Sequence, residues 1–261
     1  MEETVKKHGK SPYRVVLVHG GPGAPGELTL LADELSTLTS ILEPFQTKLT
    51  IEALVGELDE QISRHAEIPV TLVGHSWGAW LSFLYTAGYP DKVKKLILVS
   101  SGPFDPFYAS NIISMRSKRL TDKNRKKLFS WIERLDEPEE QNKDDLFRQV
   151  GELINRADAF DPIQGLNPKV HYDYNMYYQV WNEAQDLRNS GALLNAASGI
   201  SCPVVAIHGD YDPHPAEGIR KPLTTGLQDF KFYLLRNCGH HPWEEKLSRD
   251  TFLSILSEHI S

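Results

Sequence analysis

Short β-branched apolar runs that alternate with amphipathic stretches constrain the fold of this chain more than any other feature. Residues 14–20 (RVVLVHG), 70–74 (VTLVG) and 204–209 (VVAIHG) have the composition of strands that are buried on both faces. Residues 51–62 place apolar side chains on one helical face, and residues 77–88 show the same helical spacing. This alternation predicts an α/β fold with a mostly parallel sheet, right-handed crossovers and flanking helices.

Further elements extend the pattern. Strands are predicted at residues 95–101 (KLILVSS), 230–235 (FKFYLL) and 40–45 (SILEPF). Helices are predicted near residues 216–227 and over the amphipathic end at residues 243–260. All of these segments fit the same layered architecture.

The alternation of strands and helices stops for about 100 residues in the middle of the chain, which is too long for a plain connection. This segment has a helical character, so residues 1–102 and 200–261 are predicted to form the core and residues 103–199 a helical cap inserted into it. The basic run at residues 116–127 and the acidic run at residues 133–145 are interpreted as solvated helix faces.

The charge balance excludes several classes of partner. Lys and Arg number 28 against 35 Asp and Glu, which gives a net charge of −7 and repels phosphate backbones and anionic lipids. No apolar run reaches the roughly 18 residues that span a bilayer, and residues 1–10 lack a signal-peptide core. We expect a cytoplasmic protein that binds a small molecule or short peptide, with no nucleic-acid or membrane partner. The oligomeric state is left open.

The residues GHSWG form the pattern G-x-S-x-G between a predicted strand and a predicted helix. A serine on so tight a turn is forced into strained backbone geometry, so small residues are needed at the positions that Gly74 and Gly78 occupy. The turn lifts the hydroxyl of Ser76 above the carboxyl edge of the sheet, at the positive end of a helix. This context favours a nucleophile over a surface serine.

A serine hydroxyl needs an imidazole to accept its proton and a carboxylate to orient that imidazole. Asp212 follows the predicted strand at residues 204–209, and His240 follows the one at residues 230–235. Loops after the carboxyl ends of parallel strands gather at one edge of a sheet. Ser76, Asp212 and His240 are therefore predicted to meet there.

Other acids and histidines lie close to these positions in the sequence. Asp210, two residues before the preferred acid, is assigned to the turn after the strand. Asp105 is kept as the alternative acid and His241 as the alternative base. His19 and His75 are expected to pack or to bind loop backbone instead of transferring protons.

Three motifs carry a resemblance to a known family. They are HGGPG (residues 19–23), GHSWGA (residues 74–79) and the loops around Asp212 and His240. With these motifs, and with the chain order serine, aspartate, histidine, the chain resembles serine hydrolases of the α/β-hydrolase superfamily, in particular the proline iminopeptidase group. The resemblance covers residues 14–101 and 202–261 and leaves the predicted cap unmatched.

The resemblance implies specific roles. Ser76 would be the nucleophile, Asp212 the acid and His240 the base. The backbone N–H groups of Gly21 and Trp77 would form the oxyanion hole, in which loss of one donor typically costs about a hundredfold in rate. No metal and no other cofactor is implied.

The chain also departs from the proline iminopeptidase pattern. Residues 42–48 (LEPFQTK) stand where those peptidases carry a DxRGxG-like segment, and the N-terminus leaves little room for a first strand pair. In those peptidases acidic cap residues hold the free amine of the substrate. The candidates here are Glu183, Asp173 and Asp158, none of which aligns with the family pattern.

The cap also contains a tyrosine-rich segment. Its aromatic residues either pack the cap on the sheet or line a pocket. Tyr177 and Trp181 from this segment, together with Glu183, are the substrate-binding candidates.

These observations predict a cofactor-independent serine hydrolase that forms an acyl-enzyme on a small ester or amide, with an N-terminal proline peptide as the sharpest hypothesis. The alternatives are a carboxylesterase, thioesterase or acyltransferase on the same triad, and a ligand receptor that keeps the fold with little turnover. A histidine base with an ordinary pKa of about 6.5 predicts activity that falls below neutral pH.

The two cysteines are predicted to be free thiols. Cys202 precedes one predicted strand and Cys238 follows its neighbour. If these strands are parallel, six residues at about 3.3 Å each separate the thiols by about 20 Å, beyond the reach of a disulfide.

Overall fold

The computed structural model describes residues 4–166 and 168–260, and its centre is a seven-stranded sheet in the order β1-β3-β2-β4-β5-β6-β7. The strands are β1 (Val5–His8), β2 (Val15–Val18), β3 (Ile41–Pro44), β4 (Val70–His75), β5 (Val93–Val99), β6 (Val204–Gly209) and β7 (Phe230–Leu235). Strands β2 to β7 are parallel, and β1 pairs with β3 in the antiparallel sense. The predicted α/β fold with a mostly parallel sheet is confirmed.

Strand β1 was not predicted, because four residues with two lysines carry little apolar signal. It lies at the edge of the sheet, and only Val5 and His8 at its two ends are buried. Its register pairs Val5 with Pro44 and His8 with Ile41. The N-terminus therefore supplies one edge strand, where the sequence suggested little room for a first strand pair.

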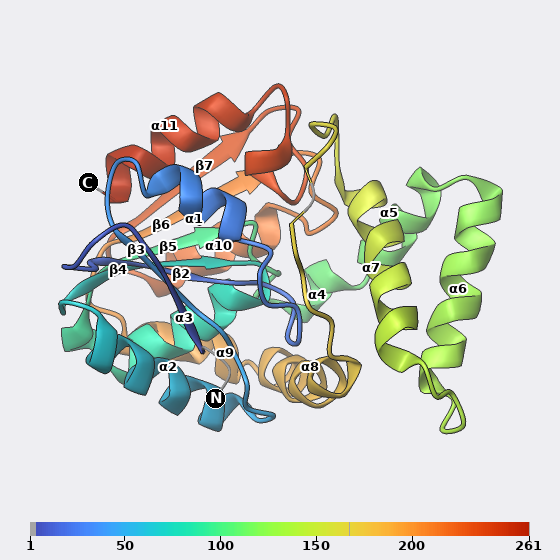
Figure 1. Ribbon diagram of the computed structural model, residues 1–261, viewed down its shortest axis with the longest axis horizontal. Coiled ribbons are helices and arrows are strands. Elements are labelled where there is room, and N and C mark those ends of the chain that lie inside the picture. The colour runs from blue at the N-terminus through green and yellow to red at the C-terminus, as the bar shows by residue number, and fades with distance from the viewer. Residues whose placement is uncertain (1–3, 167, 261) are drawn as a thin grey trace.

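Helices cover both faces of the sheet (Figure 1). One face is covered by α1 (Thr29–Leu35) and α11 (Arg249–Ile260), and the other by α2 (Ile51–His65), α3 (Trp77–Gly88) and α10 (Glu217–Gly226). Each face has its own apolar core, and the central strands contribute alternate side chains to the two cores. This arrangement explains why the central strands carry apolar side chains on both faces.

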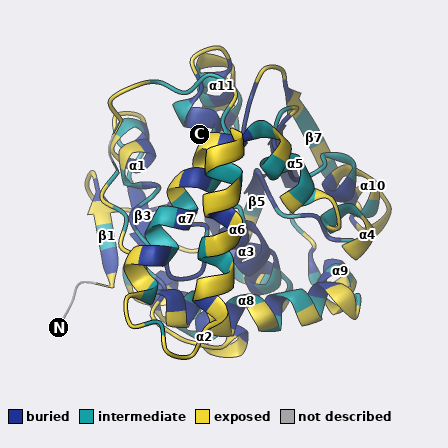
Figure 2. Cartoon of the chain, turned by 90° about the vertical axis from the view of Figure 1, so that its right-hand side faces the viewer, coloured by how far each residue is buried: buried dark blue, intermediate teal, exposed yellow. Residues whose placement is uncertain are grey.

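Helices α4 to α9 lie between β5 and β6 in the chain. They are α4 (Pro106–Ala109), α5 (Ile112–Arg119), α6 (Asp122–Asp136), α7 (Lys143–Asp158), α8 (Tyr174–Asn189) and α9 (Ala192–Asn195). Helices α6 and α7 share a small apolar core of their own, beside the sheet (Figure 1). Their outer faces are largely exposed (Figure 2), as expected for charged helical runs.

The C-terminal segment differs from the predicted continuous helix over residues 243–260. A 3₁₀ turn, η3 (Pro242–Glu244), is followed by irregular backbone, and α11 begins only at Arg249. The reason is that Glu245 is buried and its carboxylate accepts backbone N–H groups from Gly239 and Phe160. A regular helix would not leave this side chain free to join two distant loops.

The remaining 3₁₀ turns are η1 (Pro90–Lys92) and η2 (Ala196–Gly199).

Cys202 and Cys238 are free, as predicted, and the strands beside them are parallel neighbours. Among the described residues, no helix is long and apolar enough to cross a membrane.

Candidate active site

The turn between β4 and α3 holds Ser76 in a strained conformation. Its φ of 53° and ψ of −116° lie in a region that side chains rarely occupy. A Cβ atom on Gly74 would collide with the carbonyl of Gly78, and one on Gly78 would collide with the backbone of β2. The glycines of the motif are therefore required by close packing of backbone around the serine.

The three side chains that the sequence predicts to meet form one hydrogen-bonded chain. Nε2 of His240 lies 3.0 Å from Oγ of Ser76, and Nδ1 of His240 lies 2.7 Å from Oδ2 of Asp212. The residues come from the loops after β4, β6 and β7, whose carboxyl ends share one edge of the sheet. Their separation in the sequence is bridged by the parallel topology.

Asp212 is surrounded by histidines. Its Oδ1 accepts the backbone N–H of His214 at 2.9 Å and faces Nδ1 of the same residue at 2.7 Å. Nε2 of His208 lies 3.7 Å from Oδ2, and the ring of His214 lies 4.7 Å from that of His240. The carboxylate is thereby fixed with one oxygen directed at His240.

The electrostatics favour a charged acid and a basic histidine. Burial alone would raise the pKa of Asp212, but the charge of His240 and the hydrogen bond from His214 outweigh it and hold the pKa well below its ordinary value. Burial alone would lower the pKa of His240, and the charge and hydrogen bond of Asp212 reverse this, so it is raised above 6.5. Burial lowers the pKa of His214 to about 4, so this ring is neutral at neutral pH.

The alternative residues lie elsewhere. Asp210 accepts the N–H of Cys238 at 3.4 Å and belongs to the turn after β6, and Asp105 accepts the N–H of Phe107 as the N-cap of α4. The ring of His241 lies against those of His75 and Trp243. The geometry thus favours Asp212 and His240 over these alternatives.

The predicted oxyanion-hole residues flank the serine. Trp77 is the first residue of α3, so no preceding helical turn takes its N–H, and Gly21 has the positive φ of 36° that a glycine accepts readily. Gln46 joins the two segments: its amide donates to the carbonyl of His19 at 3.0 Å and accepts from the indole of Trp77 at 2.8 Å. Gln46, in the segment that departs from the DxRGxG-like pattern, therefore binds the side chain of Trp77 and the backbone two residues before Gly21.

The substrate-binding candidates of the inserted helices are largely engaged in packing. Trp181 stacks between Trp80 and Tyr177, at 5.8 Å and 6.2 Å between ring centroids. The carboxylate of Glu183 accepts the N–H of Ile51 at 2.8 Å, at the start of α2. Asp173 caps α8 by accepting from the N–H of its third residue. Trp181 and Glu183 thereby tie α8 to α3 and α2, and Asp173 stabilises the start of α8.

The basic run contains one residue that is not solvated. Arg116 of α5 binds both carboxylate oxygens of the buried Asp158 through Nε and Nη2, and its side chain is 16% exposed. The carbonyl of Asp158 accepts the N–H of His240 at 3.0 Å. The interpretation of residues 116–127 as a solvated face is therefore wrong at Arg116, because helix α5 turns this side chain toward the histidine loop.

Two groups of side chains have the composition of a metal site among the described residues. They are Glu27, His75 and His241, and Asp212, His214 and His240. In each group the nearest nitrogen and oxygen are 2.7 Å apart, which fits a shared proton. Ligands about 2.0–2.1 Å from a tetrahedral zinc would stand farther apart than this.

A cavity of about 680 Å³ borders Gly23 and Gln46 and is also lined by Met176 of α8. The three residues of the hydrogen-bonded chain do not line it. Its size is typical of ligand pockets. We therefore assign the chemistry to the hydrogen-bonded chain and not to this cavity.

Comparison with known proteins gives the family. The model of the alpha/beta hydrolase fold family matches residues 67–247, which is more than half of the chain. The chain belongs to this family. Among curated proteins, no sequence matches this α/β-hydrolase.

Solved structures agree with this assignment at the level of fold. VinJ superposes with a TM-score of 0.71 at 16% identity, covering 98% of this chain and 93% of VinJ. A proline iminopeptidase from Mycobacterium smegmatis superposes with a TM-score of 0.62 at 16% identity, covering 98% of this chain and 93% of the peptidase. A monoacylglycerol lipase from Paleococcus ferrophilus superposes with a TM-score of 0.61 at 18% identity, covering 100% of this chain and 98% of the lipase. These identities show the shared fold alone, and the neighbours include both peptidases and lipases.

Several residues around the site of this α/β-hydrolase were not found from the sequence. His214 lies two positions after Asp212, so its place beside the acid had a weak local signal. Glu27, Gln46 and Glu245 had none, because they reach His75, His19 and Phe160, which are distant in the sequence. Only the folded chain brings these polar groups together.

Proposed function

We propose that the chain is a serine hydrolase that cleaves a small ester or amide through an acyl-enzyme on Ser76. The observation that carries this proposal is the continuous hydrogen-bonded chain from Ser76 through His240 to Asp212. A receptor that only binds its ligand would have no use for a strained serine aligned with a buried histidine and carboxylate. In this proposal residues 103–199 act as the cap over the site.

Acylation follows from the geometry. Nε2 of His240 accepts the proton of Ser76 as Oγ bonds to the substrate carbonyl carbon, and the carbonyl electron pair moves to oxygen. The resulting oxyanion is held by the N–H groups of Gly21 and Trp77. Collapse of this intermediate breaks the bond to the leaving group, which takes the proton from His240. Asp212 keeps the imidazole in the required tautomer.

Deacylation repeats these steps with water. His240 removes a proton from a water molecule as its oxygen bonds to the acyl carbon, and Oγ of Ser76 then leaves with that proton. The products are a carboxylic acid and the free enzyme. No cofactor takes part in either half of the reaction.

The contacts of the inserted helices favour an ester over an N-terminal proline peptide. Each of the three carboxylates considered for the substrate amine already has a partner: Glu183 the start of α2, Asp173 the start of α8 and Asp158 the guanidinium of Arg116. A cationic amine would have to displace these contacts, whereas a neutral ester would not.

The test combines labelling with assays. A fluorophosphonate is expected to label the protein at Ser76, and Ser76→Ala is expected to remove the label and lower kcat/KM by about 10⁶-fold. Short aryl esters and a prolyl anilide are then assayed side by side, with faster turnover expected for the esters. A correctly folded wild-type protein that takes no label at Ser76 would falsify the proposed function.

A further inference from the structure

Glu27 carries a largely buried carboxylate that the proposed reaction leaves without a role. It follows the glycine-rich loop, and its side chain is only 15% exposed. Its Oε1 faces Nδ1 of His75 at 2.7 Å and also accepts the backbone N–H of Gly20 in a short hydrogen bond. One oxygen atom therefore joins the glycine-rich loop to the residue that precedes the nucleophile.

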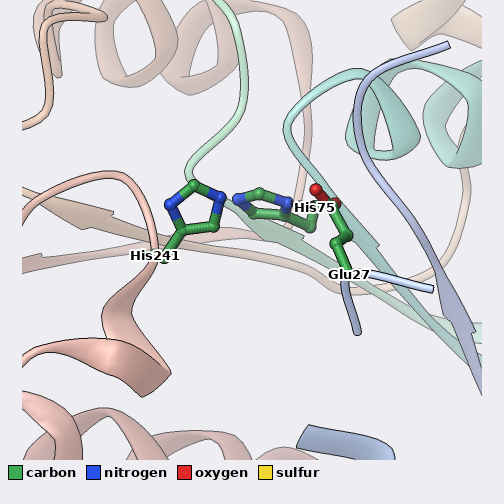
Figure 3. A group of neighbouring side chains, drawn as sticks. All are labelled: Glu27, His75 and His241. Carbon is green, nitrogen blue, oxygen red and sulfur yellow. Dashed lines mark hydrogen bonds and ion pairs between the residues drawn. The ribbon is translucent and has the colours of Figure 1, made fainter. Parts of the chain in front are cut away.

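His75 extends this connection to a third loop. Its Nε2 lies 3.1 Å from the carbonyl oxygen of His240, and the side chain is 2% exposed. Figure 3 shows the ring of His75 between the carboxylate of Glu27 and the ring of His241. Both ring nitrogens of His75 thus face oxygen acceptors, and a neutral imidazole could donate to only one of them. Only the imidazolium form of His75 can donate a hydrogen bond to both acceptors, and in that form it is paired with the carboxylate of Glu27.

The surroundings of Glu27 keep it charged. Burial alone would raise its pKa, but the charge and hydrogen bond of His75 outweigh this and lower it to about 2. Burial lowers the pKa of His241 to about 3, so that ring is neutral and packs against His75 without competing for the carboxylate.

We propose that Glu27 and His75 are positioning residues that hold the glycine-rich loop and the histidine loop in register with Ser76. This inference rests on the proposed function. A Cβ on Gly20 would stand 2.9 Å from Cβ of Ser76, so the loop is seated directly against the nucleophile. The next amide along the loop is that of Gly21, one of the two oxyanion donors.

The reason such positioning affects catalysis is geometric. The three loops follow three different strands, and each can shift independently unless side chains join them. An oxyanion donor or base displaced by about 1 Å can cost about a hundredfold in rate. The ion pair of Glu27 and His75 contacts all three loops, through Gly20, through the residue before Ser76 and through the carbonyl of His240.

The experiment uses Glu27→Gln, which keeps the size and the acceptor oxygen but removes the charge. We expect kcat on a short aryl ester to fall about 10- to 100-fold, with KM changed by less than about threefold. The rate of Ser76 modification by a fluorophosphonate should fall in parallel. Glu27→Asp, which restores the carboxylate on a shorter side chain, should recover part of kcat.

The chain offers a matched control in Glu43, another buried carboxylate hydrogen-bonded to a histidine. Glu43→Gln is expected to lower stability but to leave kcat unchanged, because the pair lies at the β1 edge of the sheet. A folded Glu27→Gln protein with kcat within twofold of wild type would overturn the proposal. So would a fall in kcat that Glu43→Gln reproduces.

Two further outcomes keep the test decisive. If Glu27→Gln does not fold, His75→Gln is measured in its place with the same expectation for kcat and KM, and full activity in that variant would overturn the proposal. Failure of the proposed function itself is recognised separately, because the wild-type protein would then take no label at Ser76. A labelled wild type with an equally fast Glu27→Gln rejects the positioning role alone.

Discussion

The candidate site and the edge of the sheet each hold a buried histidine–carboxylate group, and these two groups differ in what the second ring nitrogen of the histidine faces. The site group is Asp212 with His240, and the edge group is Glu43 with His8 of β1. In the edge group, Nε2 of His8 lies 2.9 Å from Glu43 and Nδ1 lies 2.7 Å from Asp33. In the site group, Asp212 takes one nitrogen of His240 and the hydroxyl of Ser76 faces the other.

This difference between the two groups shows what a histidine–carboxylate pair needs in order to accept a proton. Both nitrogens of His8 face carboxylates, so the ring holds two protons and has no acceptor site left to offer. His240 has one carboxylate and one hydroxyl, so its second nitrogen can accept a proton from Ser76. Burial and a close carboxylate are common to both groups, and the partner of the second nitrogen separates them.

The largest expected effect comes from removing the charge of the site group. Asp212→Asn keeps the shape of the side chain but favours the wrong tautomer of His240, so kcat should fall about 10⁴-fold. Steady-state kinetics on a short aryl ester measure this. Asp210→Asn, two residues earlier in the same loop, is the control and should keep kcat within about threefold. A loss confined to Asp210→Asn would reassign the acid.

A substitution in the edge group should lower the stability of the protein and leave its activity unchanged. Glu43→Gln leaves His8 without its buried partner and should lower the free energy of unfolding by about 3 kcal/mol. Burial alone would lower the pKa of His8, and its hydrogen bonds to Glu43 and Asp33 raise it overall. A raised pKa in the folded state stabilises the protein most below pH 6.5 and loses this effect as pH rises through the folded value.

Urea unfolding of wild type and Glu43→Gln at several pH values checks this. The difference between the two proteins should be largest below pH 6.5 and should shrink as the pH increases. If it grows with pH, the assignment of a protonated His8 is contradicted.

The smallest effect is a displacement of the pH profile. His240 must be neutral to accept the proton of Ser76, and its pKa is raised above the ordinary 6.5 because the charge and hydrogen bond of Asp212 outweigh burial. We expect kcat/KM to fall on the acidic side of an apparent pKa above 6.5, a higher value than the sequence alone suggested. Rates measured from pH 5 to pH 9 at constant ionic strength, about 0.1 M, test this. An acid limb centred below 6.5 would contradict it.

The fold was predictable from local features. Each central strand is a short β-branched run, and the glycines around Ser76 mark a turn that admits no side chain, so neither needed knowledge of distant residues. Strand β1 was missed because an edge strand with two lysines is stabilised by pairing with β3 and not by its own composition. Helix α11 begins later than its periodicity suggests because Glu245 is used to hold two loops.

The candidate site likewise contains some residues that the sequence predicted and others that it did not. Order along the chain and position after strands were enough to select Ser76, Asp212 and His240, because parallel topology fixes where strand ends meet. The partners of Arg116 and Glu27 were not predictable, since each depends on the path of a loop or an inserted helix. A charge run has the same composition whether its residues face water or a buried carboxylate.

The amino-acid sequence by itself determined the layered architecture, the strained serine turn and the order of the three polar residues, because these depend on short-range periodicity and on backbone sterics. Only the tertiary structure decided which histidine nitrogen faces a hydroxyl, which carboxylates are already occupied and which side chains join the loops. The physical reason is that hydrogen bonds act over about 3 Å, and the groups they join are brought within that distance only when the chain is folded.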